Sequence, residues 1–362
     1  MSSPANWRSE GEPPGDIEEF WRELAGTRDT VRFDEYMAGC LYHPLVGFYS
    51  RSGRSGRDGD FLTSPEVGPL FGTLVARAVE AWWEQIGRPD PFAVVEVGAG
   101  RGTLAAEVLG EVGEACAEAL RYRLVEVSAP QLEIARARLE GVRGVDFGSE
   151  WPPARRTVGP AAHVVIANEL LDNLAFRVLQ STGDGWDELH VGMVDGELVE
   201  ILLPVTGEVP FPRLPSGVRI PWQVEAATWV ERTLAVEGLR RLVCFDYART
   251  TAEMAPRRWW EWVRTYRGHR RGSHPLESPG RQDITCDVAL DQLPGRPTVV
   301  TQAEFLREAG LDEITAEAER IWLEGAARGD LEALAARSSL SEARALTDPG
   351  GLGGFKVIQW VR

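Results

Sequence analysis

The sequence predicts an α/β protein built on a doubly wound, mostly parallel, Rossmann-like sheet. Short and nearly continuous apolar runs alternate with segments of helical periodicity. A strand buried on both faces produces such a run, and strand–helix alternation is typical of parallel sheets. A glycine-rich turn also joins the first apolar run to the helix that follows it. The elements below are justified in chain order.

The chain before this sheet predicts a helical extension over residues 16–90, preceded by a disordered tail over residues 1–15 that is polar and contains three prolines. Helices are expected over Asp16–Leu24 and Val31–Leu41, and Tyr42–Gly59 is expected to be a loop because it is rich in Gly, Ser and Arg. From Val67 onward apolar residues recur on one helical face.

The start of that last helix carries the run Thr63-Ser64-Pro65-Glu66. Thr63 and Glu66 have the spacing of a capping box, and proline suits the first turn of a helix. Capping alone leaves the preceding Gly59-Asp60-Phe61 unexplained. We therefore expect the first turn of this helix to form one wall of a binding site as well.

The core of the fold is expected over residues 91–180, an insertion over 181–240, and the remainder of the core over 241–362. The predicted strands are Phe92–Val97, Tyr122–Val127, Gly144–Phe147, His163–Ala167, Leu242–Tyr247 and Phe355–Val361. Within the insertion, Asp195-Gly196 predicts the turn of a hairpin. Thr301–Ala309 and Asp330–Arg344 are expected to be helical.

The glycine turn Gly98-Ala99-Gly100-Arg101-Gly102 lies between a predicted strand and a predicted helix. Glycine lets the backbone approach a ligand closely, and the N–H groups that open a helix carry partial positive charge. Glu126 ends the next predicted strand, where an acid can bind two ribose hydroxyls. The G-x-G-x-G spacing, preceded by Glu96, favours S-adenosylmethionine over a dinucleotide. The alternative is an ordinary tight turn with Glu126 in solvent.

The fourth predicted strand ends in Asn168-Glu169-Leu170-Leu171-Asp172. Ligands of open α/β sheets bind beyond the carboxyl ends of the strands, so these polar side chains are candidates for the acceptor side of a methyl transfer. Such a transfer needs an aligned nucleophile and a group that takes its proton. The alternative is that Asn168 or Asp172 caps the following helix, with Glu169 in solvent.

Several longer segments resemble the MidA-like class I methyltransferases, a family that includes a mitochondrial complex I assembly factor that is a protein arginine methyltransferase. The segments are RDGDFLTSPEVGPLFG, VVEVGAGRGTLAAEVL, LVEVSAPQL, IANELLDNLAF and GGFKVIQWV, and the similarity runs nearly from end to end. The resemblance implies a class I methyltransferase sheet, S-adenosylmethionine as cofactor, and methylation of an arginine on a partner protein.

Carried over by position, the resemblance places Asn168, Glu169 and Asp172 at the catalytic centre. The residues it implies at the cofactor are Asp60, Thr63, Ser64, Pro65, Glu66, Glu96, Gly98, Ala99, Gly100, Gly102, Glu126, Val127, Asp146 and Phe147. The chain departs from the family pattern at Ala175, at Ala248 and around residues 146–151 and 264–269. These departures keep a small-molecule acceptor open as an alternative. A third hypothesis is an assembly factor that binds the cofactor without turnover, and the intact glycine turn, Glu126 and N-E-x-x-D segment argue against it.

Composition limits the partners. The chain has 362 residues and a formal net charge of −16, which argues against nucleic-acid binding because phosphate neutralisation needs a basic face. The basic aromatic segment 256–275 is the exception. Within 256–290 we expect a lid or substrate-channel segment, and the alternative for 256–275 is a plain amphipathic helix with a solvated loop. The four cysteines and five histidines show no metal-ligand spacing. Because no run suits a signal peptide or a membrane span, we expect a cytoplasmic protein, with a homodimer left open.

Overall fold

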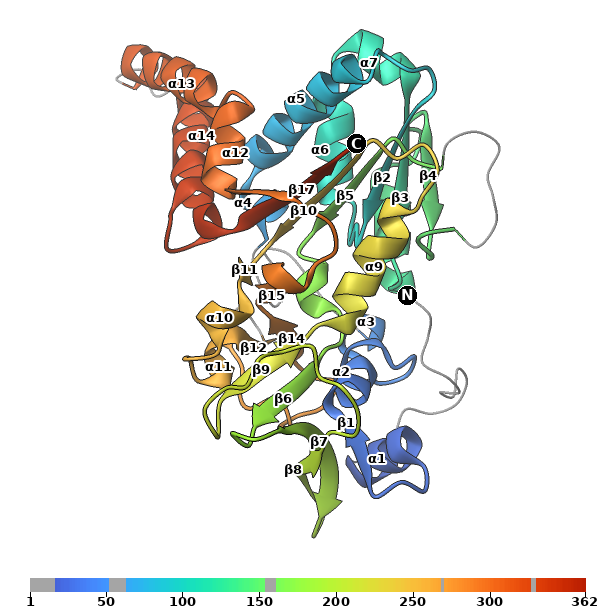
Figure 1. Cartoon of the computed structure of the whole chain (residues 1–362). Coiled ribbons are helices and arrows are strands. Elements are labelled where there is room, and N and C mark those ends of the chain that lie inside the picture. Colours follow the sequence, from blue (N-terminus) through green and yellow to red (C-terminus); the bar gives the residue numbers. More distant parts are fainter. Residues whose placement is uncertain (1–16, 52–62, 154–160, 268–269, 327–329) are drawn as a thin grey trace. The chain divides into compact units, whose positions relative to one another are not determined.

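The computed structural model describes residues 17–51, 63–153, 161–267, 270–326 and 330–362 (Figure 1). These residues form two compact units that are interleaved along the chain. The accessory unit comprises Met1–Phe61, Leu171–Arg232 and Ala248–Pro294, and the Rossmann unit comprises Leu62–Leu170, Thr233–Tyr247 and Gly295–Arg362. The linear partition expected from the sequence stays a prediction; in the structure, the expected N-terminal extension contributes residues to both units.

A seven-stranded sheet forms the centre of the Rossmann unit (Figure 1). Its strands are β2 (Phe92–Val97), β3 (Leu120–Val125), β4 (Val145–Gly148), β5 (Val164–Asn168), β10 (Arg241–Asp246), β16 (Thr298–Thr301) and β17 (Lys356–Val361). The spatial order is β16-β17-β10-β5-β2-β3-β4, and β17 runs antiparallel to both of its neighbours. The predicted Rossmann-like class I methyltransferase sheet is confirmed.

The direction in which the chain adds strands reverses between β2 and β5. From β2 the chain proceeds to β3 and β4 on one side, and from β5 it proceeds to β10 on the other. Ligands of such sheets bind beyond the carboxyl ends of the strands at this reversal. The glycine turn follows β2 and Asn168 ends β5, so both sequence motifs stand at that point of the sheet.

Helices pack against the sheet, and their apolar side chains form the hydrophobic core of the Rossmann unit together with those of the strands. They are α4 (Ser64–Val67), α5 (Pro69–Gln85), α6 (Thr103–Glu111), α7 (Glu114–Ala119), α8 (Ala129–Arg138), α12 (Gln302–Glu308), α13 (Leu311–Gly325) and α14 (Leu331–Thr347), with the 3-10 turn η3 (Leu352–Gly354). Fully buried Phe71 of α5 packs edge-on against Phe245 of β10, with 5.4 Å between ring centroids. Phe305 of α12 meets the same Phe245 ring at 5.1 Å.

The accessory unit has a core of its own around small sheets. Its elements are α1 (Ile17–Ala25), β1 (Thr30–Arg32), α2 (Phe33–Tyr42), α3 (Phe48–Arg51), η1 (Leu171–Asn173), β6 (Arg177–Ser181), β7 (Trp186–Val194), β8 (Glu197–Pro204), β9 (Arg219–Trp222), β11 (Ala248–Arg249), α10 (Thr251–Met254), α11 (Trp259–Trp262), β12 (Val263–Arg267), β13 (Arg270–Arg271), β14 (Asp283–Cys286), β15 (Val288–Ala289) and η2 (Leu290–Gln292). Helix α9 (Val224–Leu234) crosses the boundary between the two units.

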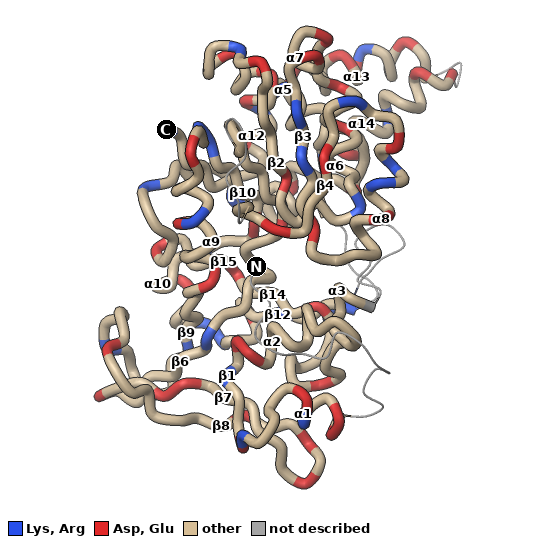
Figure 2. The backbone as a smooth tube through the Cα atoms, turned by 90° about the vertical axis from the view of Figure 1, so that its right-hand side faces the viewer, with Lys and Arg blue, Asp and Glu red and all other residues tan. Residues whose placement is uncertain are grey.

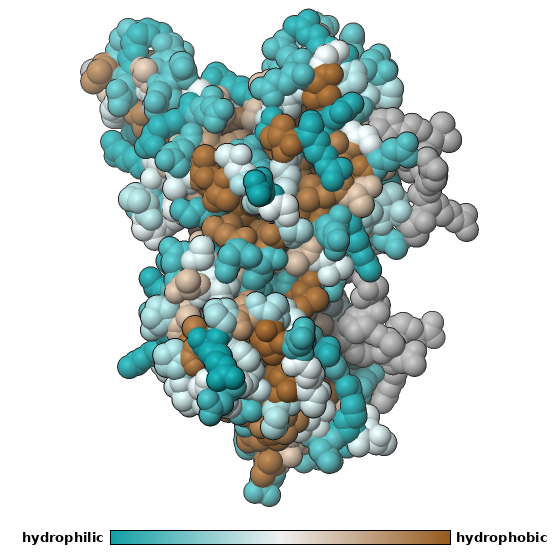
Figure 3. All heavy atoms as spheres, viewed as in Figure 1, coloured by the Kyte–Doolittle hydropathy of each residue, from teal (hydrophilic) through white to brown (hydrophobic). Residues whose placement is uncertain are grey.

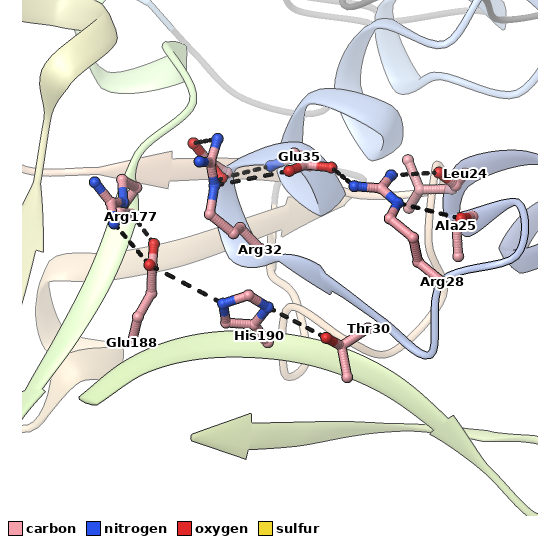
Figure 4. Close-up of polar contacts among 10 residues, drawn as sticks. Leu24, Ala25, Arg28, Thr30, Arg32, Glu35, Arg177, Glu188 and His190 are labelled. Atoms are coloured by element: carbon pink, nitrogen blue, oxygen red, sulfur yellow. Dashed lines mark hydrogen bonds and ion pairs between the residues drawn. The ribbon is translucent and has the colours of Figure 1, made fainter. Parts of the chain in front are cut away.

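Polar contacts join the first strand of the accessory unit to its hairpin (Figure 4). Strand β1 pairs antiparallel with β7, and Thr30 Oγ1 lies 3.3 Å from His190 Nδ1. Glu188 of β7 accepts two hydrogen bonds from the Arg177 guanidinium of β6. A bidentate arginine–carboxylate pair of this kind fixes the register of neighbouring strands.

The structure differs from the predicted elements at several boundaries. Residues 30–32 form a strand, so the helix expected from Val31 begins at Phe33. The expected loop after Tyr42 contains the short helix α3. Gly68 divides the helix predicted to begin in the Thr63–Glu66 run into α4 and α5, because its extended backbone (φ 164°, ψ −179°) cannot continue a helix.

Segment 256–275 is not a plain amphipathic helix. Its described residues form α11, β12 and β13, and Trp259 and Trp262 belong to the accessory core. The hairpin predicted at Asp195-Gly196 is confirmed, since β7 and β8 pair on either side of this turn and both of its residues have positive φ. Helices α9 and α13 have no counterpart among the predicted elements.

Charge is spread over the chain rather than held in one segment. Figure 2 shows Asp and Glu positions interleaved with Lys and Arg positions along most elements. On the face drawn in Figure 3, hydrophilic side chains cover most of the α13–α14 hairpin, with a hydrophobic spot at its outer end. Leu323, Leu331 and Leu334 of these helices are exposed. Of the helices in the described ranges, none has the length and apolarity that a membrane crossing requires.

Candidate functional site

The glycine turn has the backbone that only glycine adopts without strain. Gly98, Gly100 and Gly102 have φ values of 73°, 53° and 71°. A Cβ added at Gly98 would lie 3.1 Å from Cδ1 of Leu170, which follows β5. Gly102 is the N-cap of α6, and buried Ala99 accepts its N–H through a 2.9 Å bond. The turn therefore exposes backbone rather than side chains at the sheet's switch point.

Glu126 closes the turn from the neighbouring strand. Its two carboxylate oxygens accept the N–H groups of Gly100 and Ser128, each at 2.8 Å. The residue is 7% exposed, and burial raises its pKa while these backbone donors oppose that rise. A carboxylate has about four acceptor positions, and the backbone of Val127 also hydrogen-bonds to this one, so capacity remains for a ligand's hydroxyl group. Strand β3 ends at Val125, two residues before the predicted end, so Glu126 follows the strand.

Glu96 is a second buried acid, at the end of β2. The Tyr122 hydroxyl donates to it over 2.7 Å, and burial raises the pKa of Glu96 to about 8. The nearby Glu107 and Glu126 raise that pKa further. Glu96 therefore holds its proton at neutral pH and adds no negative charge beside the glycine turn.

The segment Thr63–Glu66 is a helical turn, α4, with a different cap from the predicted one. The Thr63 hydroxyl donates to the Glu66 carboxylate over 3.2 Å and makes no cap bond to a backbone N–H. Ser64 is fully buried, and its hydroxyl donates to Gln302 of α12 over 2.9 Å. Burial raises the pKa of Glu66, opposed by Thr63 and by the charges of Arg101 and Arg138. Pro65 is buried beside them, and Asp60 lies outside the described residues.

Asn168 and Glu169 stand at the carboxyl end of β5, as the sequence predicts. Glu169 has φ 49°, a left-handed backbone that is rare for a residue with a side chain. Its N–H donates to the carbonyl of Phe245 on β10 over 2.8 Å, which holds this conformation. Asn168 donates to the Glu169 carboxylate over 3.4 Å, and within the described structure its buried Oδ1 has no hydrogen-bond partner. Strain of this kind is concentrated at functional sites.

Asp172 belongs to the accessory unit, where it lies in η1 and is 2% exposed. The adjacent Asn173 donates to Asp283 Oδ1 and to the Ile284 carbonyl, over 3.0 and 3.2 Å. The Tyr49 hydroxyl reaches the same Asp283 oxygen over 3.1 Å. Burial, and then the charges of Asp283 and Asp172 among others, raise the pKa of Tyr49. This cluster of η1, α3 and β14 is polar and acidic, and the chain links it to Glu169 through two leucines.

The remaining predicted cofactor residues lie just after β3 and within β4. Val127 is exposed, and Asp146 pairs with Arg123 over 3.6 Å. The Arg136 guanidinium lies 4.7 Å above the Phe147 ring. These side chains are far more exposed than Glu126, and their role at a cofactor stays a prediction.

Three residues that hold the candidate site residues in place were not predicted from the sequence. Ser128 supplies a backbone donor to Glu126, and Gln302 holds Ser64. Asp283 gathers the polar cluster of the accessory unit. Only Asp283 had a visible signal, the acid-rich DITCDV segment, because backbone donors and contacts between distant helices leave no local pattern. Among the described residues, no group of three or more His, Cys, Asp or Glu side chains is arranged to hold a metal ion.

The residues around the glycine turn fit S-adenosylmethionine. This cofactor carries an ammonium group and a sulfonium, which the carboxylate of Glu126 suits, and a ribose, whose hydroxyls can donate to the same carboxylate. It has no phosphate that would require a basic side chain. The left-handed glycines leave room for close approach to the backbone.

Comparison with known proteins places this chain in a family. The family model described as S-adenosyl-L-methionine-dependent methyltransferase matches residues 74–306. The mitochondrial protein arginine methyltransferase NDUFAF7 homolog of Drosophila melanogaster is 30% identical over 280 residues, which cover 70% of this chain and 63% of that protein. The mitochondrial NDUFAF7 of Danio rerio, also named a protein arginine methyltransferase, is 26% identical over 325 residues, covering 77% and 72%.

A solved structure supports the same family as the family model and the curated relatives. A COG1565 superfamily member from Burkholderia thailandensis, bound to S-adenosyl-homocysteine, is 26% identical, with a TM-score of 0.74 over 97% of this chain and 95% of that one. The expectation of a cytoplasmic location is contradicted, because the curated relatives are named as mitochondrial. That expectation rested on the missing apolar run, which does not distinguish one compartment from another. The chain belongs to the MidA-like family of S-adenosyl-L-methionine-dependent methyltransferases, and S-adenosylmethionine is its cofactor.

Proposed function

We propose that this protein methylates a guanidinium nitrogen of arginine in a partner protein. The observation that carries the proposal is Glu169, an acid in a left-handed backbone directly after β5, at the switch point of the sheet. A guanidinium presents a planar fork of donors that matches carboxylates. The curated relatives named as arginine methyltransferases support the same acceptor class.

Each residue has a defined task in this proposal. S-adenosylmethionine supplies a methyl group on a sulfonium, which is a good leaving group. Glu169 accepts hydrogen bonds from the guanidinium and so fixes which nitrogen faces the methyl group. The nitrogen–carbon bond forms as the carbon–sulfur bond breaks, and the proton released from that nitrogen passes to the Glu169 carboxylate. Asn168 orients Glu169 through the hydrogen bond between their side chains.

Labelled methyl transfer tests the acceptor. The protein is incubated with methyl-labelled S-adenosylmethionine and a cell lysate whose methylation has been suppressed, and the protein and small-molecule fractions are counted separately. We expect label in the protein fraction, released on hydrolysis as methylarginine. Label only in small molecules would replace arginine with a small-molecule acceptor. Label on another amino acid, or in neither fraction despite cofactor binding, would contradict the proposal.

Substitution of Glu169 separates catalysis from cofactor binding. We expect Glu169→Gln to keep the dissociation constant for S-adenosylhomocysteine within about twofold and to lower kcat by about 100-fold, as for loss of a proton acceptor. The matched control is Glu197→Gln, at the start of β8 on the exposed hairpin turn, which should change neither value. Unchanged kcat in Glu169→Gln would remove this residue from the reaction.

A further inference from the structure

A small hollow, separate from the candidate cofactor site, lies in the Rossmann unit where β10 begins and β17 ends. Its volume is about 250 Å³, and its lining includes Arg240, Arg241, Arg362, Trp82 and Gln85. Three arginines in one small hollow are notable in a chain whose formal net charge is −16. None of the contacts that build the cofactor site involves these residues.

This hollow lies at the amino ends of the parallel strands, whereas the glycine turn lies at their carboxyl ends. Strands β10, β5 and β2 are parallel, and Arg241 is the first residue of β10, aligned with Val164 at the start of β5. The glycine turn and Asn168 are at the carboxyl ends of the same set of strands. A ligand in the hollow would therefore be separated from the cofactor by the length of the strands.

Arg241 is held in place by neutral groups only. Its Nη1 donates to Gln359 Oε1 over 3.0 Å and its Nη2 to Gln85 Oε1 over 3.1 Å, while its Cζ lies 5.2 Å from the centre of the Trp82 ring. Burial lowers the pKa of Arg241, and the charge of Glu308 opposes this without forming an ion pair. A half-buried cation whose partners are all uncharged is stabilised by an added anion.

The two other arginines add exposed positive charge beside it. The Arg362 N–H donates to the Arg240 carbonyl over 2.9 Å, which keeps the two residues adjacent. Neither side chain makes an ion pair with a carboxylate in the described part of the chain, although the protein has 55 Asp and Glu residues against 39 Lys and Arg. After burial, the charge of Arg240 is the second cause that lowers the pKa of His163.

We propose that this hollow binds a phosphate-type anion, as free diphosphate or as the phosphoryl group of a small metabolite. Guanidinium groups bind phosphate oxygens through paired, charge-assisted hydrogen bonds, and each Nη of Arg241 carries a second N–H besides the one donated to Gln359 or Gln85. A volume of about 250 Å³ is smaller than the usual pocket for a drug-sized ligand, so it suits a phosphoryl group and excludes a whole dinucleotide.

Calorimetry at constant ionic strength tests the proposal on the full chain. Inorganic phosphate, diphosphate and ADP are titrated separately, with sodium chloride replaced as the anion is added. We expect diphosphate to bind with a dissociation constant below about 1 mM and Arg241→Gln to weaken it at least about tenfold. Tighter binding of ADP than of diphosphate assigns the site to a phosphorylated metabolite, and equal or weaker binding assigns it to the free anion.

The controls separate binding from folding and from general charge. Arg213→Gln removes an exposed arginine of the accessory unit, 76% exposed, and should leave diphosphate binding unchanged. The double variant Arg240→Gln with Arg362→Gln changes only exposed side chains and should weaken binding even if Arg241→Gln lowers the melting temperature. S-adenosylhomocysteine affinity should stay within about twofold in all variants. No heat with any anion at 10 mM, or equal weakening by Arg213→Gln, would overturn the proposal.

Discussion

Glu96 and Glu126, the two buried acids beside the glycine turn, differ in the protonation state that their hydrogen-bond donors and burial favour. Glu126 accepts backbone N–H groups from Gly100 and Ser128, which favour its ionised form. Glu96 has the Tyr122 hydroxyl as its hydrogen-bond donor and is fully buried, so its pKa rises to about 8. The first acid is suited to accept hydroxyl donors, and the second holds a proton at neutral pH.

Loss of the Glu126 carboxylate should weaken cofactor binding. Glu126→Ala removes the acceptor of two backbone donors, and of the ribose hydroxyls that we propose it binds; hydrogen bonds to charged groups contribute about 1.5–3 kcal/mol each. We expect the dissociation constant for S-adenosylhomocysteine, measured by calorimetry, to rise about 10- to 100-fold. Glu133→Ala on α8, whose side chain is 76% exposed, is the matched control and should bind normally. Equal affinities in the two variants would exclude Glu126 from the site.

Glu96 should make stability fall as the pH rises. Its pKa is about 8 in the folded protein against 4.5 for an ordinary glutamate, so the folded state binds the extra proton. The stability that this proton contributes is present in full below about pH 4.5 and is lost as the pH rises to about 8. Glu107, with a pKa of about 7, acts in the same direction.

Glu96→Gln keeps the acceptor for Tyr122 and removes the ionisation. We expect urea denaturation between pH 5 and pH 9 to show a smaller decline of the unfolding free energy in Glu96→Gln than in the unchanged protein. Glu140→Gln, an exposed position after α8, should follow the unchanged protein. Parallel curves for Glu96→Gln and the unchanged protein would mean that Glu96 does not take up this proton.

At the level of elements, the C-terminal helices hold the short α4 turn in place. Gln302 of α12 accepts the Ser64 hydroxyl and donates to the Leu346 carbonyl of α14 over 3.2 Å. Glu342 of α14 accepts the Leu70 N–H at the start of α5 over 3.1 Å. The Ser64–Gln302 and Leu70–Glu342 contacts join residues more than 230 positions apart in the sequence, and all three contacts are buried.

Removing Gln302 should loosen α4 and weaken cofactor binding together. Gln302→Ala leaves the Ser64 hydroxyl and the Leu346 carbonyl buried without a partner, which costs about 1–3 kcal/mol for each group. We expect a lower unfolding free energy in urea and a several-fold rise in the S-adenosylhomocysteine dissociation constant. Glu332→Ala, an exposed change on α14, should alter neither. Destabilisation with unchanged cofactor affinity would separate α4 from the cofactor site.

The sequence predicts strands and turns well and long-range contacts poorly. Strand β2 matches its prediction because a doubly buried run is apolar at nearly every position, and the Asp195-Gly196 turn is set by local backbone preference. The sequence predicts a helix from Val31, within β1, because three residues are too few to show the alternation of a strand. Only its pairing with β7, about 160 residues later, makes it a strand.

At the level of the whole molecule, two units share one chain that passes between them several times. Each unit has its own buried core, yet Asn168 and Glu169 belong to the Rossmann unit and Asp172 to the accessory unit. Local patterns follow the order of the chain, whereas the units are assembled by sheet pairings between distant segments. The linear divisions drawn from composition carry no information about those pairings.

Hydrogen exchange with and without S-adenosylhomocysteine tests which unit holds the cofactor. The Gly100 and Ser128 amides already depend on Glu126, and a ligand that binds the folded state slows their opening. We expect added protection in peptides covering Gly98–Thr103 and Val125–Ser128, and none in the β7–β8 hairpin of the accessory unit. In Glu126→Ala the first two peptides should exchange faster even without ligand. Protection confined to the hairpin would place the cofactor outside the Rossmann unit, because the glycine turn would then respond to the ligand no more than the rest of the chain.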